Sequence, residues 1–215
     1  MRAPIFAIAL FLVACPKPEV AVDQDAAFWT WVTKEEVRLA EATKSDPVAV
    51  MNEIQAKLVA AQPGLIAEIA LDPTEGEPQT LVVSADGDKK YFAAAQALVS
   101  SAPKLGRWKV VAFRQRRPAQ DIEINGQNHS VGDFYFKDAG RQPGKIDVDI
   151  FVKGLDDANK QALFQVAFLM LDAILGEHDV ETKIGAIELK ALPDGTAGLK
   201  PLTDLPAVVD AISNP

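Results

Sequence analysis

Hydrophobic residues recur at helical spacing in two stretches that follow the first 25 residues. Residues 28–42 keep apolar side chains on one side and charged side chains on the other. Ser45-Asp46-Pro47 marks the start of a second helix, because a capping side chain precedes a proline in the first turn. Gln62-Pro63-Gly64 ends that helix. The pattern predicts an N-terminal helical hairpin whose apolar side other residues must cover.

Beyond residue 64 the spacing changes, and one order of elements occurs twice. Residues 65–113 and residues 134–189 each predict strand, strand, helix and strand, with alternation clearest at residues 146–152. In both, the second strand enters the helix through an acidic turn, Asp86-Gly87-Asp88 or Asp156-Asp157. We therefore expect an α+β fold in a single two-layer domain, residues 26–215, built from two ββαβ units. They would form one mixed, mainly antiparallel sheet with helices on one face, beside the N-terminal hairpin.

Several local signals refine this outline. Asp121 to Gly126 predicts a hairpin, because Asn-Gly suits a tight turn. The helix from Asp156-Asp157 to Leu175 is apolar almost all round, which predicts a central position, and Gly176 ends it. Residues 180–189 are expected to form a strand, and residues 203–212 a short last helix.

Composition excludes several classes of protein. The chain has 215 residues, 48% of them hydrophobic, and a formal charge of -8. That acidic balance argues against sequence-independent nucleic-acid binding and against a polybasic membrane-surface protein. A lone cysteine excludes an internal disulfide and a multi-cysteine zinc site.

The first fifteen residues have the form of an export signal. Arg2 precedes an unbroken apolar run at residues 5–13, which is too short to cross a bilayer as a helix. The run ends in Leu12, Val13, Ala14 and Cys15, which resemble the lipobox of bacterial lipoprotein precursors. The resemblance implies that the Cys15 thiol receives a diacylglyceryl group and that signal peptidase II cuts before it. Residues 1–14 would then be the signal peptide and residues 15–25 a lipid-anchored tether.

The position of the only cysteine favours this interpretation over two others, a secretory signal with an incidental cysteine and an uncleaved cytoplasmic helix. Two or three acyl chains anchor a protein stably. After cleavage before Cys15, Pro16 would be the second residue of the mature protein. In lipoproteins of enteric bacteria, an Asp at that position favours retention in the inner membrane. We therefore expect a protein of the bacterial cell envelope, facing the periplasm or the surface at the outer membrane.

Two clusters near the predicted domain surface have alternative interpretations. Arg114, Arg116 and Arg117 form the basic cluster, which either contacts an anionic partner, such as a lipid headgroup or an acidic peptide, or is a solvated strand end. Phe28, Trp29 and Trp31 follow the tether and either rest at a membrane interface or cap the core.

The acidic positions have structural explanations. Helix capping accounts for the turns at Asp86/Asp88 and Asp156/Asp157 better than cation binding. Glu177, His178, Asp179 and Glu181 would alternate faces in an extended strand, and His129 is remote in sequence, so a structural role is favoured. We expect no catalytic residue, metal or cofactor.

Parts of the domain resemble small hypothetical bacterial proteins to which no activity is assigned. The resemblance rests on residues 28–31, 84–87, 102–113 and 171–177. It implies no site residue.

The working hypothesis is a lipid-anchored envelope protein that works by binding, with the membrane as partner through Cys15 and another envelope protein as a further candidate. One alternative is a carboxylate-dependent envelope hydrolase that uses Asp86, Asp172 or Glu181. Another is an immunity-like inhibitor of a partner protein, which predicts an exposed apolar patch.

Overall fold

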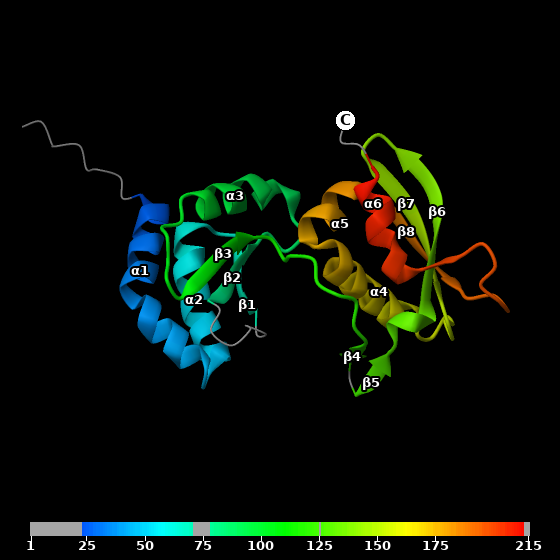
Figure 1. Ribbon diagram of the computed structural model, residues 1–215, viewed down its shortest axis with the longest axis horizontal. Coiled ribbons are helices and arrows are strands. Elements are labelled where there is room, and N and C mark those ends of the chain that lie inside the picture. Colours follow the sequence, from blue (N-terminus) through cyan, green and yellow to red (C-terminus); the bar gives the residue numbers. More distant parts are fainter. Residues whose placement is uncertain (1–22, 71–77, 125, 213–215) are drawn as a thin grey trace, which may run out of the picture.

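The computed structural model describes residues 23–70, 78–124 and 126–212. The lipobox residues Leu12, Val13, Ala14 and Cys15 lie outside the described residues. Two halves follow one another along the long axis (Figure 1), and each has its own hydrophobic core. We call residues 23–113 the N-terminal half and residues 118–212 the C-terminal half. Residues 114–117 connect them.

The N-terminal half opens with the predicted helical pair, α1 (Gln24–Thr43) and α2 (Pro47–Ala61). Helix α1 begins four residues earlier than predicted, because the Asp23 carboxylate accepts hydrogen bonds from the backbone N–H groups of Asp25 and Ala26. Asp46 caps α2 through the Ala49 N–H, as its position before Pro47 predicted. The helical hairpin is therefore confirmed.

The first ββαβ unit completes this half. It comprises β1 (Ile66–Ala70), β2 (Gln79–Ser84), the short 3-10 helix η1 (Lys89–Tyr91), α3 (Phe92–Ser100) and β3 (Trp108–Ala112). Strand β2 is central, antiparallel to β1 and parallel to β3. Leu81 on β2 shares a buried core with Leu39 of α1, Ile54 of α2 and Leu98 of α3. The helical pair thus covers the apolar surface that a three-stranded sheet and one short helix leave open.

The C-terminal half contains the second unit. The hairpin β4 (Ile122–Ile124) and β5 (Gln127–His129) and η2 (Val131–Asp133) precede β6 (Phe134–Gln142), β7 (Lys145–Val152) and α4 (Lys160–Leu175). The chain continues through α5 (Glu177–Lys183), β8 (Ile184–Ala191), β9 (Lys200–Pro201), η3 (Leu202–Asp204) and α6 (Leu205–Asp210). The sheet order is β8-β7-β6-β9, with β7 antiparallel to β6 and parallel to β8. The second unit therefore repeats the connectivity of the first.

The α+β class, the two ββαβ units and the N-terminal helical pair are confirmed, but the units form separate sheets instead of one. Phe113 has a φ of 68°, which turns the chain out of the first sheet directly after β3. Pro118 follows four residues after Arg114 and has no N–H to donate to a strand ladder. Each sheet consequently closes its own core.

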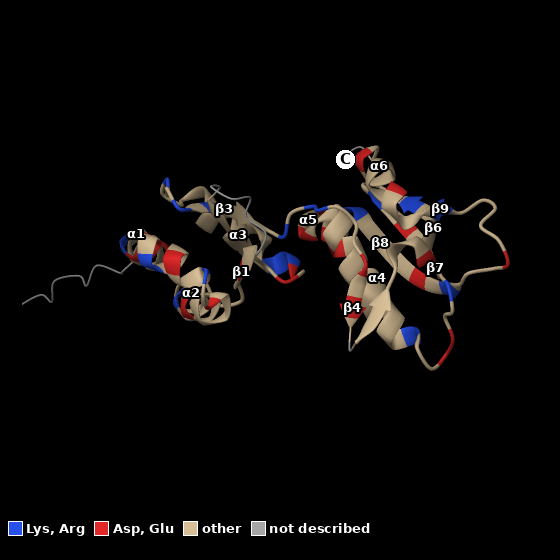
Figure 2. Ribbon diagram, turned by 60° about the horizontal axis from the view of Figure 1, so that its bottom comes forward, with Lys and Arg blue, Asp and Glu red and all other residues tan. Residues whose placement is uncertain are grey.

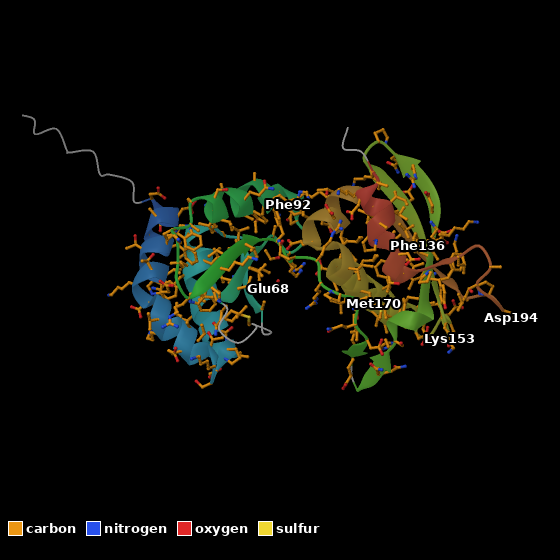
Figure 3. All side chains as sticks on the ribbon, viewed as in Figure 1. Glu68, Phe92, Phe136, Lys153, Met170 and Asp194 are labelled. Atoms are coloured by element: carbon orange, nitrogen blue, oxygen red, sulfur yellow. The ribbon has the colours of Figure 1, made fainter. Side chains whose placement is uncertain are left out.

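Two further predictions for the C-terminal half need correction. Residues 177–183 form α5 and the strand begins only at Ile184. Gly176 makes this possible, because its φ of 76° turns the chain, and a Cβ there would lie 2.9 Å from the carbonyl oxygen of Arg114. Helix α4 buries Met170 and Leu171 against the sheet (Figure 3 labels Met170), yet Phe164 and Phe168 on its other side are exposed. One sheet covers one side of a helix, so α4 is not buried all round.

Candidate functional site

A buried glutamate joins the two halves. Glu177, the first residue of α5, is 1% exposed. One of its carboxylate oxygens accepts hydrogen bonds from the Ala85 and Gly87 N–H groups at 2.9 and 3.2 Å. The other accepts from the Ser84 hydroxyl at 2.8 Å and from the Arg114 N–H at 3.1 Å. Burying a carboxylate is costly unless donors surround it, and here four donors do so.

The turn after β2 is shaped to receive this carboxylate. Asp86 and Gly87 both have positive φ angles, 50° and 74°, so neighbouring N–H groups turn towards one point. Asp88 accepts a hydrogen bond from the Lys90 N–H and caps η1, and Asp156 accepts from the Asn159 N–H. The capping interpretation is confirmed for Asp88, whereas Asp86 shapes the turn. It is not confirmed at the second turn, because the N-cap of α4 is Asn159, whose side chain makes no capping bond, and Asp156 bonds only within the turn before the helix.

Arg114 gathers carboxylates from both halves around one guanidinium. Its Nε is 2.8 Å from Asp172 of α4, and its Nη1 is 2.8 Å from Glu68 of β1. Asp86 lies 3.6 Å away, and Figure 3 shows Glu68 on the side of its half that faces the C-terminal half. Burial raises the pKa of Asp172, and the nearby Arg114 offsets only part of that rise. The ion pairs that Arg114 forms with Glu68 and Asp172 are therefore partly shielded from water.

The basic cluster does not present three free cations. Arg116 forms ion pairs with Asp179 of α5 and Asp210 of α6, and its Nε donates to the Leu175 carbonyl oxygen at 2.9 Å. Burial alone would raise the pKa of Asp179, but hydrogen bonds led by that from Arg116 hold it below its usual value. Arg117 is exposed at its side chain, while its N–H donates to the Ala173 carbonyl oxygen. The anionic contact of Arg114, Arg116 and Arg117 stays a prediction, and Arg114 and Arg116 pair with carboxylates of this chain.

The acidic run that opens α5 also serves the junction. The His178 ring lies 5.6 Å from that of Phe92 and 5.5 Å from that of Phe113, so it packs on aromatic residues of the N-terminal half. Glu181 lies 3.8 Å from Lys89 of η1. Within residues 23–70, 78–124 and 126–212, no group of three His, Cys, Asp or Glu residues is placed to hold a metal ion. The helical spacing, which the strand prediction missed, directs Glu177, His178 and Glu181 to the N-terminal half.

The carboxylates of the hydrolase alternative do not face one another across an open site. Asp86 and Asp172 both point to Arg114, and Glu181 lies beside Lys89. Asp172 is buried, so its oxygens are directed to a cation and not to solvent. This geometry stabilises the junction.

A pocket of about 420 Å³ opens at the same junction, lined by the C-terminal half and by Lys89 of the N-terminal half. Lys89 comes from η1, Lys145 from β7, Phe168 from α4 and Glu181 from α5, and we call this the Lys89–Lys145 pocket. Figure 2 shows basic and acidic segments meeting near α5, between the halves. Burial lowers the pKa of Lys145, and the ammonium group of Lys89 lowers it further. This pocket has no local sequence signature, because its two lysines lie 56 residues apart, on η1 and β7.

An exposed apolar surface adjoins the pocket. Phe164, Phe168 and Leu169 are 41, 37 and 47% exposed, and we call them the α4 patch. Phe168 belongs to both the patch and the pocket. An apolar patch of this kind marks an interaction surface more often than scattered apolar residues do. The signal available in the sequence was the predominantly apolar composition of α4, since a helix packed on one sheet cannot bury every side.

The aromatic residues behind the tether belong mainly to the core. Phe28 and Trp29 are buried, and the Trp29 Nε1–H donates to the Leu98 carbonyl oxygen at 3.0 Å. Trp31 is half-buried, and the ammonium of Lys57 lies 5.7 Å from its ring. The core interpretation is confirmed for Phe28 and Trp29. A shallow groove of about 650 Å³ runs beside them, between α1 and α3.

Among the residues that the structure describes, none of the helices combines the length and the apolar character needed to span a bilayer. No protein-family model, curated protein or solved structure matches this chain. The resemblances to lipoprotein precursors and to small hypothetical bacterial proteins therefore stay predictions.

Proposed function

We propose that this chain is a lipid-anchored protein of the bacterial cell envelope and that its α+β domain works as a binding module. The observation that carries the anchoring is Leu12-Val13-Ala14-Cys15, in which the only thiol of the chain follows a short apolar run. A tether that contains Pro16 and Pro18 connects this cysteine to the domain. Diacylation supplies stable membrane attachment without a spanning helix.

Binding is supported by the α4 patch and the Lys89–Lys145 pocket, which share Phe168. An apolar wall beside a small number of polar groups is the usual composition of a ligand site. The junction carboxylates support the same role indirectly. Glu177 and Asp172 hold the two halves against each other, so Lys89 stays opposite Lys145.

Substitution of Cys15 tests the anchor. Cells that express the full chain are fed an alkyne-tagged palmitate, and labelling and membrane fractionation are compared for the natural chain, Cys15→Ser and Pro16→Ala. We expect Cys15→Ser to lose both the label and the membrane fraction, because it removes the only thiol. Pro16→Ala, which keeps the thiol, should retain both. An unlabelled natural chain, or a Cys15→Ser protein that stays in membranes, would contradict the proposal.

A further inference from the structure

The Lys89–Lys145 pocket combines a cationic side with an apolar side. Lys89, Lys145 and Gln142 supply N–H donors, and Phe168, which is 37% exposed, supplies the apolar surface, since Val180 and Ile184 are buried. At about 420 Å³, its volume lies in the range of small-molecule sites. Lys89 comes from the N-terminal half and the other lining residues from the C-terminal half, so the two lysines share the pocket only when the halves are joined.

The charges in the pocket leave donors available. Lys145 Nζ donates to the carbonyl oxygens of Glu181 and Ile184 at 3.4 and 3.3 Å, and an ammonium group carries three N–H donors. Lys89 is half-exposed, and its ion pair with Glu181 is long at 3.8 Å.

The other nearby carboxylate is already engaged. Asp147 Oδ1 accepts from the Ala186 N–H at 2.7 Å, and Gln142 Nε2 lies 3.4 Å from Oδ2. The residues that line the pocket therefore contribute two ammonium groups and one carboxylate, in a chain whose formal charge is -8.

We propose that this pocket binds an amphiphilic anion, with its carboxylate or phosphate head between Lys89 and Lys145 and its apolar body along Phe168. The body would continue over Phe164 and Leu169, so the α4 patch and the pocket form one site. An anion between the lysines would relieve their mutual repulsion, and Phe168 would lose contact with water. The proposal rests on the proposed binding function and names the class of its ligand. A free fatty acid and an anionic membrane lipid share this chemistry.

Lysine reactivity measures occupancy of the pocket directly. The full chain, purified in neutral phosphatidylcholine nanodiscs, is methylated reductively with and without octanoate, and each lysine is followed by mass spectrometry. At octanoate concentrations ten times the dissociation constant, we expect Lys89 and Lys145 to react about tenfold more slowly. Lys44, an exposed lysine at the end of α1 in the N-terminal half, is the internal control and should not change. Acetate carries the charge alone and 1-octanol the apolar body alone, so each should protect much less.

Variants separate an anion site from general adsorption. Lys89→Gln should weaken octanoate protection of Lys145 about threefold to fivefold, the range expected for one partly exposed charge. Glu181→Gln removes the competing carboxylate and should strengthen the protection, while Lys44→Gln should leave it unchanged. Vesicles with phosphatidylglycerol replace octanoate in a parallel arm, and protection there alone assigns the ligand to membrane lipid.

Three outcomes would overturn the proposal: no protection in either arm, equal protection by 1-octanol, or weaker protection in Glu181→Gln. The anchor is tested separately, because Cys15→Ser changes no pocket residue and should show the same protection as the natural chain.

Discussion

The two ββαβ units have the same connectivity but use their helices differently. In the first, α3 has nine residues, buries Ala95 and Leu98, and shares its core with α1 and α2. In the second, α4 has sixteen residues and forms most of the helical layer, yet it leaves Phe164, Phe168 and Leu169 exposed. In the first half, α1 and α2 add helices that complete the core. In the second half, no helix that the structure describes covers the outer side of α4 at these three residues, which stays exposed.

This difference shows that a shared topology does not determine which apolar surface stays exposed. The first unit buries its apolar side chains, because α1 and α2 pack against it in one core. The second keeps an apolar stripe beside two lysines. Glu177 joins the two units. Lys89 of the first unit is therefore held beside a pocket that residues of the second unit otherwise line.

The largest expected effects come from the two cores. Leu98→Ala in α3 and Leu171→Ala in α4 should each lower the free energy of unfolding by about 3 kcal/mol, because both side chains are fully buried. Denaturant titration measures the loss, and hydrogen exchange shows which half loses protection. Leu169→Ala on the exposed side of α4 should cost less than about 1 kcal/mol. Equal losses of unfolding free energy in Leu169→Ala and Leu171→Ala would contradict the assignment of one side of α4 to the core and the other to the surface.

Glu177→Gln tests how strongly the units are joined. The amide replaces an oxygen that accepts hydrogen bonds with a group that donates them, against four converging donors. We expect a loss of about 2 kcal/mol and separation of the thermal unfolding into two calorimetric transitions. Glu188→Gln, an exposed change in the same half, should alter stability by less than about 0.5 kcal/mol. A single unshifted transition in Glu177→Gln would show that the junction contributes little.

Two aspartates beside the linker should respond to pH in opposite directions. The lowered pKa of Asp179 means that its contribution to stability is present above the ordinary Asp pKa of 3.8 and is lost as pH falls. The raised pKa of Asp172 means that its ionisation opposes folding as pH rises through 3.8. Between pH about 3 and 6, the stability of Asp179→Asn should therefore rise less with pH than that of the natural chain, and that of Asp172→Asn should rise more. Denaturation midpoints across this range measure both slopes, and equal slopes would refute the assignment.

The smallest expected effect on stability concerns the α4 patch. Phe164→Ser should change the free energy of unfolding by less than about 1 kcal/mol, because the ring is 41% exposed. It should nevertheless reduce the fluorescence of an apolar dye bound to the native protein. Val48→Ser on α2, which removes a single exposed apolar residue, is the matched control and should leave the dye signal unchanged. A large loss of stability in Phe164→Ser would show that the ring belongs to the core.

Local signals predicted most of the elements and little of the site. Asp46-Pro47 located the start of α2, and the alternation at residues 146–152 located β7, since caps and strand faces depend on neighbouring residues. Residues 177–183 were misassigned, because the turn at Gly176 is set by its packing against Arg114, a residue 62 positions earlier. The Lys89–Lys145 pocket has no local signature for the same reason.

By itself, the sequence determined the α+β class, the repeated order of strands and helix, the caps at Asp46 and Asp88, and the candidate anchor at Cys15, because periodicity and capping act over a few residues. Only the tertiary structure decided that the units close separate sheets, that Glu177 joins them, and that Lys89 lies opposite Lys145. These features depend on contacts between residues far apart in the chain, where burial and charge pairing select the partner.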